Sequence, residues 1–100
     1  MDVWAKDLMK KSDYIFDGQG YYQGQFMNHY RHGYGRHVDE NGNIFEGWFK
    51  TNNRHGQGRL IYINGDVYEG HFERDMRWGQ GKLTRADGSV YTGEFRHGDM

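Results

Sequence analysis

The sequence lacks cysteine and proline, and no long run of apolar residues occurs in it. Without cysteine the chain forms no disulfide, has no thiolate nucleophile and builds no zinc site on cysteine. No apolar stretch approaches the roughly 20 residues that a transmembrane helix needs. The first residues, which include Asp2 and Asp7, do not resemble a secretory signal. We therefore expect an intracellular, cytoplasmic protein.

A marked excess of either charge is also missing. The 100 residues carry 13 Lys or Arg against 14 Asp or Glu, which gives a net charge of −1 with neutral histidines. Domains that bind nucleic acid are usually strongly basic, so we expect no nucleic-acid partner. A chain of this length is one small domain that buries only about 60–65% of its unfolded surface. Its core is therefore expected to be thin.

Glycine and aromatic residues are abundant instead. There are 16 glycines, and Phe, Trp and Tyr make up 17% of the chain. Each glycine inside a helix costs about 1 kcal/mol relative to alanine. Glycine combined with aromatic residues is typical of β structure with tight turns. The composition therefore predicts an all-β protein.

An internal repeat of 23 residues organises the chain. Thirteen of the 16 glycines recur with this spacing, and each copy begins with the pattern aromatic-x-Gly-x-Phe. Repeats start at residues 22, 45 and 68, and a partial copy starts at 91. Such periodicity indicates one structural unit per repeat. The predicted structural core of the repeats consists of Tyr22, Gly24, Phe26, Phe45, Gly47, Phe49, Tyr68, Gly70, Phe72, Tyr91, Gly93 and Phe95.

Each repeat is interpreted as a β-hairpin. Tyr68, Gly70 and Phe72 alternate with other residues, so they share one face of a strand. We expect a turn near 74–77, a second strand around 79–83 and a tight turn at residues 87–88. The missing side chain of each glycine leaves a slot in which an aromatic ring of a neighbouring strand lies. The whole chain is predicted to form an elongated, twisted antiparallel sheet of seven or eight strands.

One position in the first turn of each hairpin has a shared conformational requirement. It holds residue types that are enriched at positive φ. The residues are His29, Asn52, Asp75 and Gly98.

The motif Tyr68-Glu69-Gly70-x-Phe72, together with His55-Gly56-x-Gly58 and Asp87-Gly88, resembles the MORN repeat (membrane occupation and recognition nexus). The resemblance covers residues 22–100, and residues 13–21 resemble the second strand of a degenerate earlier repeat. It implies a non-enzymatic scaffold, a small subunit of a cytoskeletal, ciliary (axonemal) or membrane-associated assembly. Because MORN repeats also precede enzyme domains in some families, a regulatory N-terminal piece of a larger enzyme is an alternative.

Residues 1–12 differ in composition from the sheet-forming part, 13–100. Trp4, Ala5, Leu8 and Met9 fall on one face of a helix. We expect a short helix that packs over the first repeat as a cap or docks on a partner.

No arrangement of residues indicates catalysis. Glu46 and Glu69 recur at one repeat position, and a solvated strand face explains them better than an acid–base pair does. His29 and His32 lack a matching set of metal ligands. We therefore expect no catalytic, cofactor or metal site and no small-molecule substrate.

Two rows of basic residues recur with the repeat. They contact anionic lipid headgroups such as phosphoinositides, or they pair across strands with Glu46 and Glu69. The balanced net charge favours pairing. One row, placed in the turns, is Arg31, Arg54 and Arg77; the other, opposite the aromatic face, is Arg36, Arg59 and Lys82.

Apolar residues also fall on the second face of the sheet. An exposed apolar patch with a tryptophan is typical of a protein interface. Local packing through strong twist, or cover by the N-terminal helix, is the alternative. The candidate interface residues are Ile44, Trp48, Ile61, Ile63 and Val67, with Trp4 and Leu8 of the N-terminal segment.

Overall fold

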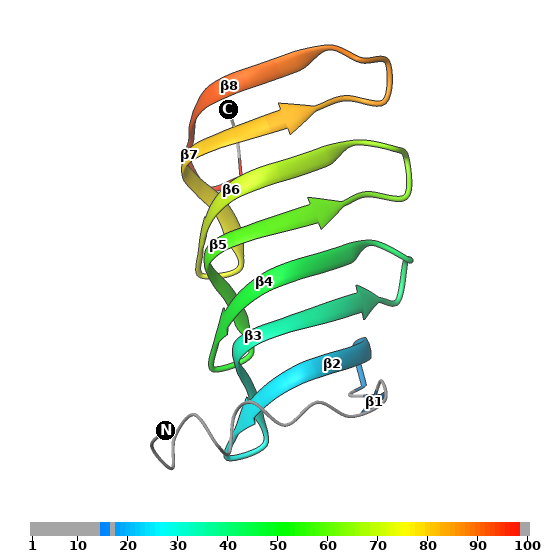
Figure 1. Cartoon of the computed structure of the whole chain (residues 1–100), viewed down its shortest axis with the longest axis vertical. Helices are drawn as coiled ribbons and strands as arrows, with labels where there is room; N and C mark the ends of the chain where they lie inside the picture. The colour runs from blue at the N-terminus through cyan, green and yellow to red at the C-terminus, as the bar shows by residue number, and fades with distance from the viewer. Residues whose placement is uncertain (1–14, 17, 99–100) are drawn as a thin grey trace.

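The computed structural model describes residues 15, 16 and 18–98, and these form a single sheet. Its eight strands are antiparallel and follow one another in chain order, which confirms the predicted all-β architecture (Figure 1). The helix expected within residues 1–12 lies outside the described residues. The strands are β1 (Ile15–Phe16), β2 (Gly20–Met27), β3 (Tyr30–Asp39), β4 (Ile44–Lys50), β5 (Asn53–Ile61), β6 (Val67–Glu73), β7 (Met76–Thr84) and β8 (Val90–Phe95).

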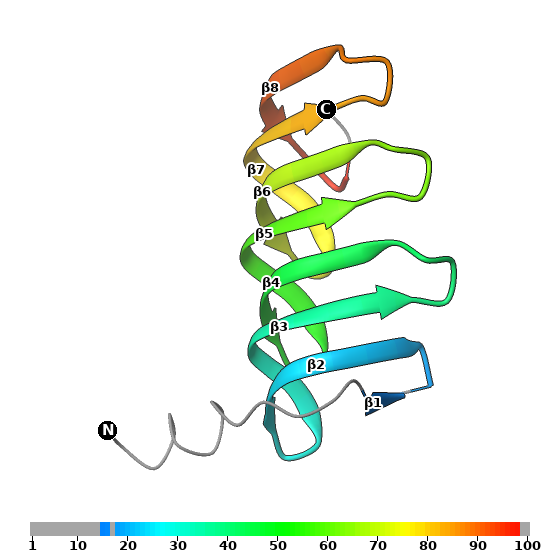
Figure 2. The ribbon, with the colours of Figure 1, turned by 45° about the vertical axis from the view of Figure 1, so that its right-hand side comes forward.

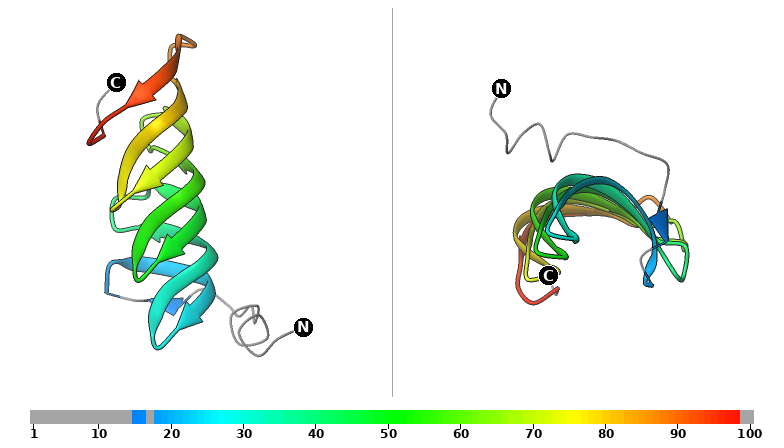
Figure 3. Two further views of the ribbon diagram at one scale, coloured as in Figure 1. Left: turned by 90° about the vertical axis from the view of Figure 1, so that its left-hand side faces the viewer. Right: turned by 90° about the horizontal axis from the view of Figure 1, so that it is seen from below.

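The sheet is elongated and bent into a trough. Its extents are 42 × 25 × 20 Å, and the hairpins succeed one another along the long axis with a steady twist (Figure 2). Seen from one end, the strands superimpose as an arch (Figure 3). We call the concave side the inner face and the convex side the outer face.

The turns between β2 and β3, β4 and β5, and β6 and β7 each contain two residues. Both residues have positive φ, with 69° at His29, 72° at Asn52 and 69° at Asp75. This conformation is that of a type I′ hairpin turn, whose twist matches that of the flanking strands. The turn expected at 74–77 is therefore shorter than predicted, because β7 already begins at Met76. At the N-terminal end, Gly20 and Tyr21 belong to β2 and not to an earlier strand.

Aromatic rings form the core on the inner face. Tyr22, Phe45, Tyr68, Phe72 and Phe95 are almost completely inaccessible to solvent. Together with three further rings they form an unbroken edge-to-face series, with centroids 4.8–5.3 Å apart. Each such pair contributes about 0.5–1.5 kcal/mol beyond its buried area. In order, the series is Phe26, Tyr22, Phe49, Phe45, Phe72, Tyr68, Phe95 and Tyr91.

A row of facing glycines crosses the sheet beneath these rings. A Cβ atom on Gly58 would lie 2.4 Å from Cε1 of Phe45, a separation that real Cβ atoms do not show. The Phe45 ring therefore covers Gly47 of its own strand and Gly58 of the next strand. The slot expected from the sequence thus exists, and it spans two strands. The row consists of Gly24, Gly35, Gly47, Gly58, Gly70, Gly81 and Gly93.

A β-bulge follows the glycine row in each hairpin. The register shifts between Gly47 and Phe49, opposite Gly56, which has a φ of 84°. The same shift recurs in the hairpins of β2–β3 and β6–β7. Bulges bend and twist the strand that contains them, which explains the curvature of the trough.

Candidate interaction surfaces

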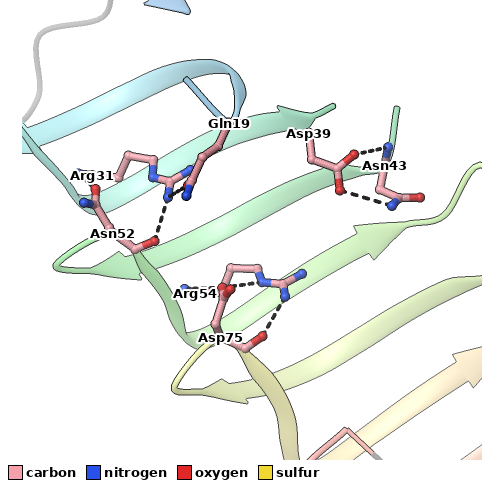
Figure 4. Close-up of polar contacts among 7 residues, drawn as sticks. All are labelled: Gln19, Arg31, Asp39, Asn43, Asn52, Arg54 and Asp75. Atoms are coloured by element: carbon pink, nitrogen blue, oxygen red, sulfur yellow. Dashed lines mark hydrogen bonds and ion pairs between the residues drawn. The ribbon is translucent and has the colours of Figure 1, made fainter. Parts of the chain in front are cut away.

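Arg54 is held on the inner face by the turn of the following hairpin (Figure 4). Its Nε lies 2.7 Å from Oδ1 of Asp75, and its Nη2 donates to the Asp75 carbonyl oxygen at 2.6 Å. The guanidinium carbon is 5.1 Å from the centroid of the Phe72 ring. The ion pair, the hydrogen bonds and the cation–π contact therefore act on one side chain.

Arg31 and Arg77 repeat the hydrogen bond to a carbonyl oxygen and the cation–π contact of this arrangement. Arg31 is only 8% exposed, donates to the Asn52 carbonyl oxygen at 2.9 Å and lies over the Phe49 ring. Arg77 donates to the carbonyl oxygen of Gly98 and lies over the Phe95 ring. We call these three contacts the arginine clasps. Those of Arg31 and Arg54 tie one hairpin to the turn of the next, and that of Arg77 ties β7 to the residues that follow β8. A row that sequence analysis assigned to the turns thus lies in strands and joins the hairpins.

The second basic row lies on the outer face and alternates with carboxylates. Arg36 faces Glu46, and Arg59 faces Glu69, with side-chain nitrogen–oxygen distances of 3.7 and 3.9 Å. All four side chains are about one-third to one-half exposed, so each pair contributes at most about 1 kcal/mol. Arg59 also faces Glu46 across the sheet, which separates the two carboxylates. The geometry matches cross-strand pairing better than an acid–base pair.

A hollow of about 310 Å³ on the inner face is lined by charged and polar residues. Arg31 and the Arg54–Asp75 pair lie on one side of it, and Asp39 and Asn43 lie on the other (Figure 4). Partial burial alone would raise the pKa of Asp39. Hydrogen bonds from the Asn43 side chain and from three backbone amides outweigh it and hold that pKa below its usual value. The Asp39 carboxylate is therefore held in place as a hydrogen-bond acceptor within its own turn.

An aromatic pair is exposed on the outer face. Trp48 and Tyr34 face each other on β4 and β3, with ring centroids 5.4 Å apart, and are 46% and 48% exposed. A hollow of about 380 Å³ beside Trp48 is lined mainly by apolar atoms, and His32 and His55 lie at its border. Trp48 was among the predicted interface residues, whereas Tyr34 was not.

An apolar row, which we call the outer stripe, crosses the outer face where the strands meet the longer turns. Three predicted interface residues lie in it, and all three are partly buried: Ile44, Ile61 and Val67. Ile63 lies apart from them, in a turn, and is 69% exposed. Trp4 and Leu8 lie outside the described residues. The full stripe consists of Phe16, Tyr21, Val38, Ile44, Ile61, Val67, Thr84 and Val90.

Two of the residues missed by sequence analysis share one property. Tyr34 and Val38 are identified only by the residue opposite them in the hairpin, Trp48 and Ile44 respectively. The turn centred near Asn41 fixes that pairing. Pairing the two strands about this turn would have indicated both residues.

Neither a group of metal ligands nor a membrane-spanning helix is found among the described residues. Among them, no three or more His, Asp or Glu side chains are grouped to hold a metal ion. Residues 15–16 and 18–98 also contain no helix long and apolar enough to cross a membrane.

Ser89, which lies in the turn before β8, donates its hydroxyl hydrogen to Asp87 in the same turn. This hydrogen bond helps to lower the pKa of the Asp87 carboxyl.

The comparisons agree with this geometry. The family model of the MORN repeat matches residues 22–44, 45–67 and 68–90, and each match begins at the first strand of a hairpin. A search of curated proteins finds no match to the chain. Tandem MORN repeats suggest a module that interacts with proteins or membranes, and the family is typically non-enzymatic. With three consecutive copies over more than half of its length, the chain belongs to the MORN-repeat family.

Proposed function

We propose that this chain is a non-enzymatic scaffold module that binds a partner protein through the aromatic pair of its outer face. The observation that carries the proposal is that the fold does not require Tyr34 and Trp48 to be aromatic. Gln57 and His71 face each other at the equivalent positions of the next hairpins. Exposed tryptophan and tyrosine beside a hollow are typical of interface hot spots.

The proposed partner is another protein subunit of a larger assembly. Family resemblance favours a cytoskeletal, ciliary or membrane-associated assembly, with the chain in the cytoplasm. Neither nucleic acid nor a small-molecule substrate is part of this proposal.

The test replaces the pair by the residues of the neighbouring repeat, in the variant Tyr34→Gln with Trp48→His. Each version is tagged in its native cell, and the co-purifying proteins are quantified by mass spectrometry at moderate salt. The double variant is expected to lose about 2 kcal/mol or more of binding free energy, roughly 30-fold in Kd. The matched control is Tyr30→Gln, which removes an aromatic residue of similar exposure, 47%, elsewhere on β3. Equal recovery of every partner by both variants would contradict the proposal.

Binding to anionic lipid is a second candidate, because Arg36, Arg59 and Lys82 share the outer face. Its support is weaker, since glutamates alternate with these residues and the arginine clasps occupy the other row. Vesicles that contain phosphoinositide are sedimented with the wild type and with Arg36→Glu/Arg59→Glu. Salt-sensitive binding that the double variant loses would favour this candidate. No binding by the wild type at low salt would remove it.

A further inference from the structure

The outer stripe is apolar along nearly its whole length, although its face is open to solvent. An antiparallel sheet with one solvated face normally alternates apolar and polar residues. The row instead places an aliphatic or aromatic residue on every strand except β7, where Thr84 stands. Phe16, Tyr21 and Val90 are 64%, 52% and 54% exposed. A surface of this kind indicates a contact that the described residues alone do not make.

The twelve residues at the N-terminus match this surface in polarity and position. Trp4, Ala5, Leu8 and Met9 fall on one helical face. The segment precedes β1, which carries Phe16 at the first position of the stripe. A helix formed by 12 residues is about 18 Å long. Four strand spacings, from β1 to β5, are about 19 Å.

Charge also matches. The turns beside the nearer part of the stripe, at 39–43 and 62–66, carry three acidic residues and no basic residue. The segment has three lysines against two aspartates. The lysines and the acidic turns would lie next to each other if the segment ran along the stripe. The acidic residues are Asp39, Glu40 and Asp66, and the lysines are Lys6, Lys10 and Lys11.

We propose that residues 1–12 of the same chain dock as an amphipathic helix along the outer stripe, over β2 to β5. The apolar face of the helix contacts the part of the stripe formed by Tyr21, Val38, Ile44 and Ile61. This contact is separate from the aromatic pair proposed to bind a partner, so either proposal can fail alone.

The first test uses Trp4 as the reporter. The chain has three tryptophans, so Trp48→Phe/Trp78→Phe leaves Trp4 as the only one. In buffer, acrylamide is expected to quench the fluorescence of Trp4 several-fold less strongly than it does in urea. Leu8→Asp in this background is expected to restore strong quenching. Ile44→Thr/Ile61→Thr is expected to do the same, since Thr84 occupies this row in β7.

The second test uses the absence of native cysteine. Leu8→Cys/Ile44→Cys is expected to form an intramolecular disulfide rapidly under mild oxidation. The control Leu8→Cys/Val90→Cys places the second thiol about 34 Å along the stripe from β1, beyond the reach of the segment. It is expected to react slowly.

Each other outcome overturns the proposal. If acrylamide quenches the fluorescence of Trp4 equally in buffer and in urea, the segment is not docked. Protection unaffected by Leu8→Asp or by the threonine pair would place the segment elsewhere. Protection or cross-linking that rises with protein concentration would assign the contact to a second copy.

Discussion

At the scale of single residues, the fold depends on glycines, which have no side chain. The row of facing glycines brings strands close enough for each ring to cover two glycines at once, as Phe45 covers Gly47 and Gly58. Gly58 does not have a positive φ, so steric exclusion and not backbone conformation explains its identity.

Gly58→Ala is therefore expected to destabilise the protein by about 1–3 kcal/mol, because the added methyl group displaces the Phe45 ring. The measurement is the midpoint of urea unfolding. Gln57→Ala, on the exposed neighbouring residue, is the control and is expected to change stability by less than about 0.5 kcal/mol. Equal midpoints for the two variants would contradict the described packing.

Residue pattern alone predicted most of this arrangement. The period of 23 and the alternation of aromatic residue and glycine identify the ring, the slot and the face. The sequence did not reveal which strands a ring covers. That depends on register, which places Gly58 opposite Gly47.

At the scale of strands and turns, the arginine clasps connect successive hairpins. The turn residue Asp75 serves as acceptor for both the backbone nitrogen and the side chain of Arg54, at 3.1 and 2.7 Å. Asn52 fills the same position in the previous turn and accepts from the backbone nitrogen of Arg31 at 2.8 Å. Asparagine and aspartate are thus both compatible with this turn.

Asp75→Gly is expected to lower the free energy of unfolding by about 1–2 kcal/mol, because it removes the side-chain acceptor of Arg54 while tolerating the φ of 69°. Asp75→Asn, which copies Asn52, is expected to lose less than about 0.5 kcal/mol. Both are measured by urea unfolding. Equal unfolding midpoints for the glycine and asparagine variants would show that the side chain of Asp75 in the clasp does not contribute to stability.

The clasps could not be predicted from the pattern because the turn was taken as four residues long. Two consecutive residues with positive φ, Arg74 and Asp75, close the hairpin instead. Arg77 then falls in β7, on the aromatic face, opposite Phe72. A difference of two residues in turn length moves a whole row of charges from a loop into the trough.

At the scale of the whole molecule, stability is distributed along one axis. Strand order follows chain order, so each strand is hydrogen-bonded only to its neighbours in sequence. Stability of such arrays is close to a sum of repeat terms and nearest-neighbour terms. Tyr68 in the middle is fully buried, whereas Tyr91 on β8 is only partly buried.

Hydrogen exchange is therefore expected to be graded along the chain. Amides of β4 to β7 are expected to exchange at least an order of magnitude more slowly than those of β8, because local opening at the end of the sheet exposes less surface. Exchange monitored by mass spectrometry on peptides resolves the difference. Uniform protection from β2 to β8 would instead indicate a single cooperative unit.

The bulge that recurs in every hairpin has a geometric consequence. Because the register shift is the same in the hairpins of β2–β3, β4–β5 and β6–β7, each hairpin adds the same bend and the same advance. Two strand spacings amount to about 9.6 Å per hairpin. The length of the molecule is therefore set in steps of one 23-residue repeat. Inserting or deleting one repeat would move a partner bound at one end by one fixed distance relative to a partner bound at the other end.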